Sequence, residues 1–269
     1  MSSVKALVLT GFGLNCDGET AYALEKAGAR AERVHLNSLI RKDKRLDRYR
    51  ILVLGGGFSW ADEHGAGVIL AARLKNRLGE DLLRFVEKGN LVLGICNGFQ
   101  VLANLGLLPG LEPGGFRREV ALVANDCGEF RDQWVHLSVS EDSPCVFTRE
   151  IHRLELPVRH GEGKFYAEPS VMEPLAANGQ IVLRYAMPDG DPARGAFPFN
   201  PNGSLEDAAG ICDLTGRVFG LMPHPEAFNH ATNHPDWTWQ REKARHSGWH
   251  WDAEGAGIRI FRNAVQYFA

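Results

Sequence analysis

The stretch LVLGICNGFQ, residues 91–100, decides the fold. Its first half is a short apolar run of the kind that forms a buried strand. Two glycines, at 94 and 98, flank Cys96, and this spacing matches the nucleophile elbow, where a strained residue joins a strand to a helix. Glycine has no Cβ, so strand and helix can approach closely at such a corner. The stretch therefore predicts a strand that turns sharply into a helix, with a cysteine at the turn.

Cys96 is predicted to be a nucleophile. It would lie at the N-terminus of a helix that begins near Asn97, where unpaired N–H groups carry a partial positive charge. That charge favours the thiolate, which is the reactive form of cysteine. Free cysteines are often merely packed in a core, but packing alone explains neither flanking glycine. The elbow is therefore the stronger interpretation.

Composition narrows the class of protein. The 269 residues are 44% hydrophobic and 23% charged, with a net charge of -3, as in ordinary globular proteins. Neither a long basic run nor an apolar stretch of membrane-spanning length occurs, so we expect no nucleic-acid and no membrane partner. No signal-like segment is evident, and we expect a cytoplasmic location. The five cysteines show no C-x-x-C spacing, which argues against a disulfide framework and a cysteine zinc site.

The first part of the chain alternates strand and helix patterns. Strands are expected at 5–10, 33–36 and 51–54, and helices at 17–27, capped by Asp17, and at 66–88, with Gly79 as a candidate interruption. Such alternation predicts a mostly parallel sheet with helices on both faces. The loop GGGFS, residues 55–59, follows a strand and is either a plain tight turn or a ligand-binding loop, since open α/β sheets bind ligands at strand carboxyl ends.

After Pro109 the pattern changes to short strands separated by turns. They are expected at 120–123, 134–139, 153–158, 164–166, 181–186, 208–214 and 217–221. Their connections are too short for crossover helices, so antiparallel strands should extend the sheet. We expect an α/β fold in one domain over residues 1–269, with a core at about 4–228. The remaining segment, 229–269, should end in an amphipathic helix at 257–268.

A second motif, Pro223-His224-Pro225-Glu226, follows the last strand pattern. Each proline favours extended geometry in the residue before it, and residues i and i+2 of an extended chain share one side. His224 and Glu226 should therefore lie together, with the carboxylate fixing the imidazole tautomer. Alone, this motif is equally compatible with an exposed turn. With the elbow cysteine upstream, it predicts a catalytic triad of Cys96, His224 and Glu226.

Two further histidine pairs have the i, i+4 spacing of metal ligands on a helix, namely His230 with His234 and His246 with His250. Their neighbours disfavour a helix, and no carboxylate completes either pair. We therefore expect no metal site in this chain.

The segments GICNGFQ and MPHPE together resemble the class I, triad-type glutamine amidotransferases, which have a flavodoxin-like fold. The segments GGFSWAD, ANDCGEF, HGEGKF and NPNGSLED extend this resemblance to the glutaminase components of phosphoribosylformylglycinamidine synthase, an enzyme of purine biosynthesis. The resemblance covers about residues 4–228. It implies that Cys96 attacks the side-chain amide of L-glutamine to form a thioester, that His224 transfers protons, and that Glu226 orients His224.

The resemblance also implies how the substrate is held. Backbone N–H groups of Asn97 and of the loop Gly56, Gly57 and Phe58 would bind the oxyanion, and Gln100 would support the glutamine site.

Further implied features concern the partner. His160, Glu162 and Asn202 would face the substrate or another subunit. Ammonia would pass to a separate synthetase subunit that carries ATP and magnesium, and a small bridging subunit is a further candidate partner. No cofactor is implied in this chain. The alternatives are a glutaminase that serves another synthetase and a non-catalytic assembly subunit, and the intact triad argues against the second.

Overall fold

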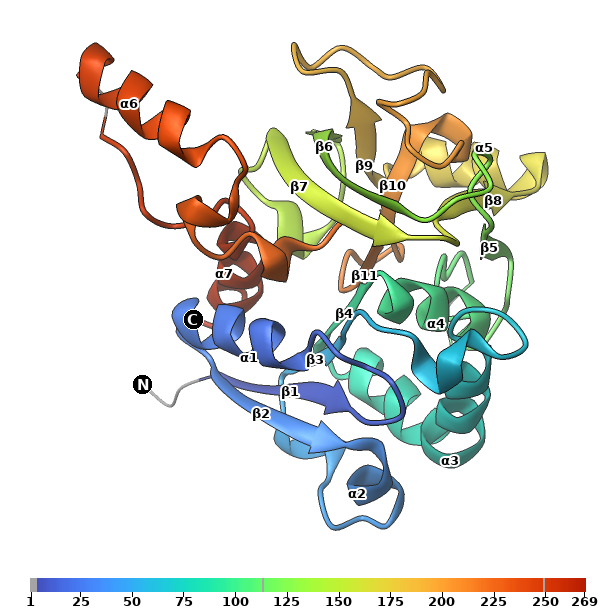
Figure 1. The fold of residues 1–269 in the computed structure, drawn as a ribbon. Coiled ribbons are helices and arrows are strands. Elements are labelled where there is room, and N and C mark those ends of the chain that lie inside the picture. The colour runs from blue at the N-terminus through green and yellow to red at the C-terminus, as the bar shows by residue number, and fades with distance from the viewer. Residues whose placement is uncertain (1–3, 113, 249) are drawn as a thin grey trace.

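The computed structural model describes residues 4–112, 114–248 and 250–269. Its centre is a nine-stranded sheet in the order β2-β1-β3-β4-β11-β10-β9-β6-β7 (Figure 1). The strands of this sheet are β1 (Lys5–Thr10), β2 (Arg30–His35), β3 (Ile51–Leu54), β4 (Leu91–Ile95), β6 (Arg131–Val139), β7 (Arg153–His160), β9 (Ile181–Ala186), β10 (Ala208–Cys212) and β11 (Val218–Leu221). Two further strands, β5 (Val120–Val123) and β8 (Lys164–Ala167), form a separate antiparallel pair.

Helices cover both faces of the parallel half of the sheet. The helices are α1 (Asp17–Lys26), α2 (Leu36–Ile40), α3 (Val68–Glu87), α4 (Asn97–Leu105), α5 (Pro169–Ala177), α6 (Trp237–Ser247) and α7 (Ile258–Gln266). Helix α1 packs against α7, and α3 packs against α4 on the other face (Figure 1). The predicted α/β class, with a parallel half and an antiparallel extension, is confirmed.

The pairing of neighbouring strands changes once across the main sheet, from parallel to antiparallel. Pairs from β2 to β11 are parallel, and pairs from β11 to β7 are antiparallel. The residues of β3, β4 and β11 are all buried, as expected for parallel strands that are covered on both faces. The carboxyl ends of β3, β4 and β11 consequently meet at one edge of the sheet.

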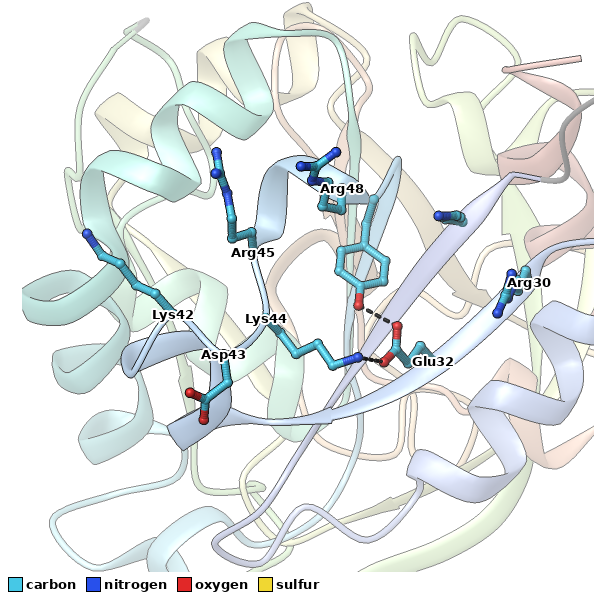
Figure 2. A pocket seen from close by; sticks show the side chains of 9 residues that line it. Arg30, Glu32, Lys42, Asp43, Lys44, Arg45 and Arg48 are labelled. Atoms are coloured by element: carbon cyan, nitrogen blue, oxygen red, sulfur yellow. Dashed lines mark hydrogen bonds and ion pairs between the residues drawn. The ribbon is translucent and has the colours of Figure 1, made fainter.

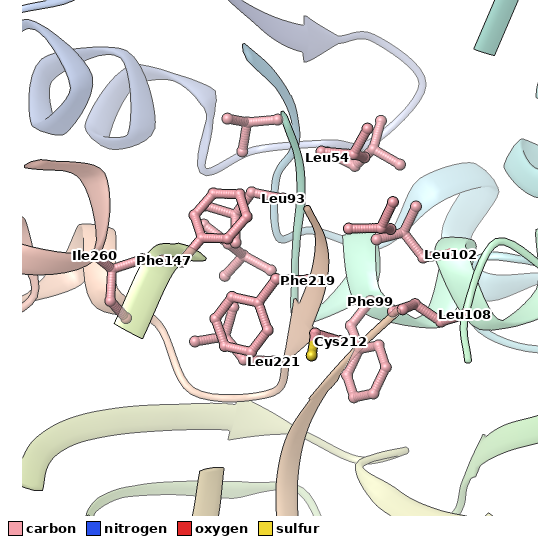
Figure 3. Close-up of a cluster of buried hydrophobic side chains, with 14 of the residues drawn as sticks. Leu54, Leu93, Phe99, Leu102, Leu108, Phe147, Cys212, Phe219, Leu221 and Ile260 are labelled. Atoms are coloured by element: carbon pink, nitrogen blue, oxygen red, sulfur yellow. The ribbon is translucent and has the colours of Figure 1, made fainter. Parts of the chain in front are cut away.

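The core is built on both sides of β4 and β11 (Figure 3). Phe99 and Leu102 of α4 lie on one side, and Phe147 lies on the other, where its ring packs 5.6 Å from that of Phe219. Gly220 makes room for Phe99, because a Cβ at this position would overlap the aromatic ring. Helix α4 can therefore lie close to the sheet, and its N-terminus is fixed at the strand ends.

Strand β7, at the far edge of the sheet, contacts the residues that follow β4 and β11. The Pro157 carbonyl of β7 accepts a hydrogen bond of 2.8 Å from the His224 amide, just beyond β11. The Arg159 carbonyl, also in β7, accepts one from the Cys96 thiol at 3.5 Å. An edge strand distant in sheet order thus closes over the carboxyl ends of β4 and β11.

Several local predictions need correction. Helix α3 is not interrupted at Gly79, because the glycine is buried under Phe116, whose ring a Cβ would approach to 3.1 Å. Residues 120–123 and 164–166 do not extend the main sheet but form the separate pair. Cys16, not Asp17, occupies the N-cap of α1.

Three helices were not predicted, namely the five-residue α2 and the longer α5 and α6. Helix α5 lies between β8 and β9, with Pro169 in its first turn, a position where proline suits a helix because its missing N–H needs no partner. Met172 and Leu175 provide its buried face. Helix α6 is mostly exposed, so it lacks the apolar periodicity that reveals a packed helix. Within the three described ranges, none of the helices combines the length and hydrophobicity that a membrane crossing requires.

A pocket of about 320 Å³ lies where β1 and β2 begin, away from the carboxyl ends of the strands (Figure 2). Six of its lining side chains are cationic, and two, Glu32 and Asp43, are anionic. Glu32 accepts hydrogen bonds of 2.5 Å from both the Lys44 ammonium and the Tyr49 hydroxyl. The pocket as a whole therefore has an excess of positive charge.

Gly98→Ala should destabilise the protein. A Cβ at residue 98 would overlap the Leu54 carbonyl oxygen and lie 2.6 Å from the carbonyl carbon, so the backbones of α4 and β3 would have to separate. We expect a loss of at least about 1–3 kcal/mol in the free energy of unfolding, measured by urea denaturation. Gly115→Ala is the matched control, because a Cβ there meets nothing within 4 Å. Equal stability of the two variants would contradict this account.

Candidate active site

Cys96 occupies the predicted elbow. Its backbone has φ 51° and ψ -106°, a left-handed conformation that is strained for a residue with a side chain. Its amide donates a 2.8 Å hydrogen bond to the Leu221 carbonyl, so the pairing of β4 with β11 persists up to the turn. Helix α4 starts at the next residue. The thiol is thus held at the carboxyl edge of the sheet. Cys96 as a whole is 6% exposed.

The flanking glycines are sterically required. A Cβ at Gly94 would lie 2.7 Å from the Gly98 carbonyl oxygen and 2.6 Å from a methyl group of Leu102. Contacts this short do not occur in relaxed structures. The elbow therefore depends on both glycines, as the sequence predicts.

His224 and Glu226 form a buried pair. The imidazole Nδ1 lies 2.6 Å from Glu226 Oε1, and the two residues are 2% and 1% exposed. The predicted contact is present, but its predicted cause is only half right. His224 is extended, whereas residues Pro225–Ala227 form a short 3-10 turn, and this turn brings the carboxylate back to the ring.

Opposing influences act on His224. Burial alone would lower the pKa of its imidazole, but the charge of Glu226, followed by the neighbouring Cys96 thiol, raises that pKa well above the ordinary value. The imidazolium is therefore stabilised by the carboxylate. Nε2 of the ring has no hydrogen-bond partner within the described chain, which leaves it free to exchange a proton with a reacting group.

A second thiol lies beside this pair. Cys16 Sγ and the nearest ligand atoms of His224 and Glu226 all lie within 4.8 Å of one another. Burial is the main reason why the pKa of the Cys16 thiol is raised. Cys16 was not predicted to be a site residue. Its place in the loop after the first strand was the available signal, because that loop meets the same edge of the sheet.

The loop after β3 offers two candidate oxyanion donors, the amides of Gly56 and Gly57. The Phe58 amide already donates a 2.9 Å hydrogen bond to the Gly13 carbonyl, and its phenyl ring is 48% exposed. The amides of Gly56, Gly57 and Asn97, by contrast, make no hydrogen bond within the part of the chain that the structure describes. Gly57 has φ 146°, which favours glycine. Of the amides suggested by the sequence, those of Gly56, Gly57 and Asn97 are therefore available to bind an oxyanion.

The side chains of Asn97 and Gln100 tie the elbow helix to its surroundings. Asn97 Nδ2 donates to Gln100 Oε1 at 3.0 Å and to Asp62 Oδ1 at 3.3 Å. Gln100 Nε2 donates to the Glu162 carbonyl at 2.5 Å. These bonds give Gln100 a structural role, and its predicted part in holding glutamine stays a prediction.

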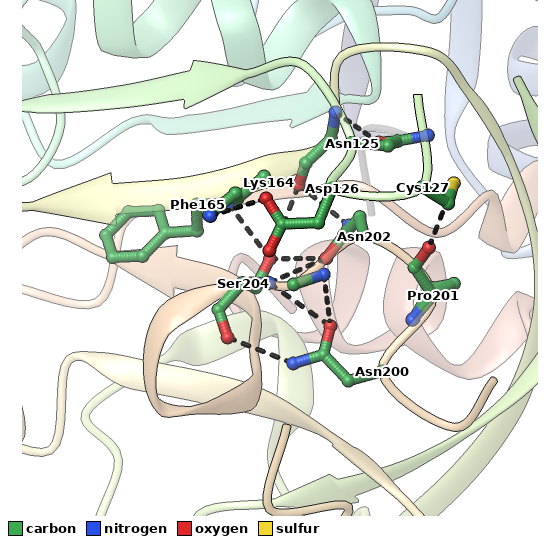
Figure 4. A network of polar contacts seen from close by, with 11 residues as sticks. Asn125, Asp126, Cys127, Lys164, Phe165, Asn200, Pro201, Asn202 and Ser204 are labelled. Carbon is green, nitrogen blue, oxygen red and sulfur yellow. Dashed lines mark hydrogen bonds and ion pairs between the residues drawn. The ribbon is translucent and has the colours of Figure 1, made fainter. Parts of the chain in front are cut away.

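The segment around residues 160–163 rests on buried polar side chains (Figure 4). Asn125 Nδ2 donates to the His160 carbonyl at 2.8 Å, and Asn202 Nδ2 donates to the Gly163 carbonyl at the same distance. His160 and Asn202 are only 2% and 1% exposed, which argues against a place on a subunit-facing surface, and their contact with a substrate stays a prediction. Asn202 satisfies the backbone of a buried turn, and His160 Nδ1 lies 3.1 Å from Asn125 Oδ1. Glu162 is partly exposed, and its carboxylate accepts from the Ala66 amide at 3.2 Å.

Comparisons with known proteins agree with these features. A family model described as a CobB/CobQ-like glutamine amidotransferase domain matches residues 3–268. A phosphoribosylformylglycinamidine synthase subunit PurQ of Methanococcus maripaludis is 45% identical over 270 residues, covering 98% of this chain and 97% of that protein. The PurQ subunit of Dehalococcoides mccartyi is 44% identical over 267 residues, covering 99% and 98%.

Solved structures are similar over the whole chain. A chain of PurLQS from Thermotoga maritima has a TM-score of 0.72 and 29% identity, with complete coverage of both chains (100% each). A glutamine amidotransferase from the same organism, with a TM-score of 0.50 and 17% identity over 99% of this chain and 92% of that one, shares the fold.

Gly56→Ala should disable the site while the fold remains. A Cβ at residue 56 would lie 2.7 Å from His224 Cε1 and 3.1 Å from Cys16 Sγ, so the imidazole would be displaced. A misplacement of about 1 Å can cost about 10²-fold in rate, and we expect a loss of that order in kcat/KM for L-glutamine hydrolysis. Gly55→Ala is the matched control, because its Cβ would meet nothing closer than 3.8 Å. Full activity in Gly56→Ala, with the stability of both variants followed by thermal denaturation, would contradict the geometry.

Asp62→Asn should make stability less dependent on pH. Burial, assisted by the charge of Glu162, raises the pKa of Asp62 to about 6 although Asn97 donates a hydrogen bond to it. When folding raises the pKa of an acid, its protonated form stabilises the folded state. This stabilisation is complete at pH values below the unfolded pKa, near 4. It is lost as the pH rises through the pKa of the folded state, about 6.

Relative to the parent, Asp62→Asn should therefore gain stability between pH 4 and pH 7. Because Asp62 is only partly buried, solvent screening limits the gain to about 1 kcal/mol or less. Urea denaturation at a series of pH values measures it, and Glu63→Gln, which removes an exposed neighbouring carboxylate, is the control. A constant difference at all pH values would show that the backbone, and not the charge, is responsible.

Proposed function

Because the chain belongs to the CobB/CobQ-like glutamine amidotransferase domain family, we propose that it is the glutaminase subunit of phosphoribosylformylglycinamidine synthase. It is a glutamine amidotransferase, an enzyme that acts on the side-chain amide of glutamine. In this proposal it hydrolyses L-glutamine to glutamate and ammonia, and residues 1–269 act as one domain. The ammonia serves the ATP-dependent conversion of formylglycinamide ribonucleotide to formylglycinamidine ribonucleotide in purine biosynthesis.

One observation carries the chemical part of the proposal, namely the buried His224–Glu226 pair with its 2.6 Å contact beside the elbow thiol. His224 Nε2 takes the proton of Cys96, and Sγ attacks the amide carbon of glutamine. As the tetrahedral intermediate collapses, His224 returns the proton to the departing nitrogen, which leaves as ammonia, and a thioester remains. Water then attacks the thioester, His224 accepts its proton and passes it to Sγ, and glutamate is released.

Glu226 supports both proton transfers without receiving a proton itself. It accepts Nδ1–H of His224, which fixes the tautomer with Nε2 available, and it stabilises the imidazolium that forms. The amides of Gly57 and Asn97 are proposed to bind the oxyanion of the tetrahedral intermediate. One such donor contributes about 10²- to 10³-fold in rate.

The proposed partner is a synthetase subunit that carries ATP and magnesium, and a small bridging subunit is a second candidate. The similar chain from Thermotoga maritima was solved as part of PurLQS, which supports a complex of this kind. We propose no cofactor for this chain. A cytoplasmic location belongs to the proposal because a reducing compartment suits a working thiol. A glutaminase serving another synthetase is the alternative.

Labelling with an electrophilic diazo-ketone analogue of glutamine tests the site. We expect one adduct on Cys96, located by peptide mapping and mass spectrometry, which excess L-glutamine suppresses. Cys96→Ala should give no adduct at this position and no hydrolysis. Glu226→Gln should retain binding but lose about 10²- to 10⁴-fold in kcat, because the imidazolium loses its counter-charge.

The partner is tested separately. If the matched synthetase works with added ammonium chloride but not with this chain plus L-glutamine, the synthetase assignment is wrong. If Cys96→Ala still hydrolyses glutamine, the assignment of the nucleophile is wrong.

A further inference from the structure

The pocket where β1 and β2 begin is lined mainly by cationic side chains, and the proposed reaction uses none of them (Figure 2). The cationic residues are Lys5, Arg30, Lys42, Lys44, Arg45 and Arg48, and the anionic ones are Glu32 and Asp43. Six cationic and two anionic side chains give the lining a net charge of +4. The chain as a whole has a net charge of -3, so positive charge is concentrated at this pocket.

Both anionic side chains of the pocket already have partners. Figure 2 shows the Lys44 ammonium and the Tyr49 hydroxyl meeting at the Glu32 carboxylate, each at 2.5 Å. Asp43 Oδ2 accepts a 3.0 Å hydrogen bond from Arg41 Nε, which lies outside the lining. The two carboxylates are therefore engaged, and the donors on Glu32 reduce its repulsion of an incoming anion.

Three cations of the pocket lack such partners. Within the described ranges, no carboxylate oxygen lies within 4.0 Å of the charged nitrogens of Lys5, Arg30 or Lys42. Lys5 and Arg30 are register partners in the parallel pairing of β1 with β2, so their side chains leave the same face of strands about 4.8 Å apart. Like charges in such cross-strand positions repel each other. A bound anion would relieve this repulsion.

The arrangement favours an anion that contacts several cations at once. Arginine forms paired hydrogen bonds to phosphate oxygens, and lysine binds phosphate as a point charge on a flexible stem. A terminal phosphate carries about 1.5–2 negative charges and each inner phosphate of a chain about one, so a triphosphate carries about four. This charge matches that of the lining. The volume of about 320 Å³ lies at the lower end of the range of small-molecule sites, about 300–1,000 Å³.

We propose that this pocket binds the polyphosphate group of a small metabolite, either a nucleoside triphosphate or a free triphosphate. Lys5, Arg30 and Lys42 contact the phosphate oxygens, while Lys44 remains on Glu32. The pocket is separate from the glutaminase site. Binding does not depend on the proposed glutaminase reaction, so the two proposals can fail independently.

Isothermal titration calorimetry on the full chain, in magnesium-free buffer, tests the proposal with inorganic triphosphate, ATP and citrate. Both phosphate compounds should bind saturably, and more weakly as NaCl screens the ion pairs. Tighter binding of ATP would identify a nucleotide as the ligand, and equal binding would show that the phosphate chain alone is recognised. The proposal is overturned if neither compound binds saturably or if citrate binds as tightly as triphosphate.

Charge variants locate the binding site. Arg30→Gln and Lys42→Gln should each raise the Kd for triphosphate about tenfold, the loss expected when a hydrogen-bonded charged partner is removed. Arg33→Gln is the matched control, because it removes one cation from the opposite face of the same strand, where Arg33 contacts Asp17 at 3.1 Å. Equal weakening by Arg30→Gln and Arg33→Gln would show attraction to the overall charge only and would overturn the proposal.

Protection of native amines gives a result that does not depend on any variant. In the unmodified chain, triphosphate should slow acylation of Lys5 and Lys42 by an N-hydroxysuccinimide ester, as measured by peptide mapping and mass spectrometry. The exposed Lys243 of α6 should react at the same rate with and without triphosphate. If Lys5 and Lys42 are also acylated at unchanged rates, the proposed site is wrong.

Discussion

The parallel pairing of β4 with β11 sets the position of the whole site. In its register Gly94 opposes Gly220 and Ile95 opposes Leu221, so the two strands end level with each other. The chain leaving β4 turns at once through Cys96, and the chain leaving β11 reaches His224 three residues later. A slip of one residue would turn each side chain to the opposite face of the sheet. The register therefore decides whether thiol and imidazole meet.

The His224–Glu226 pair is buried, and burial both changes its protonation behaviour and makes hydrogen bonds to it necessary. A buried ionisable pair is costly unless its hydrogen bonds are satisfied. The His224 backbone is held by Pro157 of β7, and the ring is held by Glu226. The segment at 160–163 is in turn fixed by Asn125 and Asn202. Pro157 and Glu226 thus hold the imidazole from two separate parts of the chain, which limits the reorganisation required when a proton moves.

The sequence predicted those features that are encoded locally. Apolar runs located most strands, and the glycine spacing around Cys96 predicted the elbow because the steric constraint lies within five residues. The contact of His224 with Glu226 was predicted for a partly incorrect reason, since a turn and not an extended segment creates it. The assigned roles of Gly56, Gly57, Phe58, Asn97 and Gln100 stay predictions, although the Phe58 amide already has a partner.

Features that depend on distant contacts were not predicted. The proximity of Cys16 to His224 requires the loop after β1 to meet the end of β11. The burial of His160 and Asn202 depends on a turn that closes across several segments. The raised pKa of Asp62 follows from its burial, assisted by the charge of Glu162, which lies 100 residues along the chain. Sequence patterns report periodicity along a segment, and they contain little information about such pairings.

The central place of β11 also has a consequence for synthesis on the ribosome. This strand lies between β4 and β10 although it follows them both in the chain. While residues 218–221 remain in the exit tunnel, the nascent sheet has a gap at its middle, and β4 presents an unpaired edge. The nucleophile therefore emerges long before its base, and the thiol acquires catalytic surroundings only when the central strand is inserted.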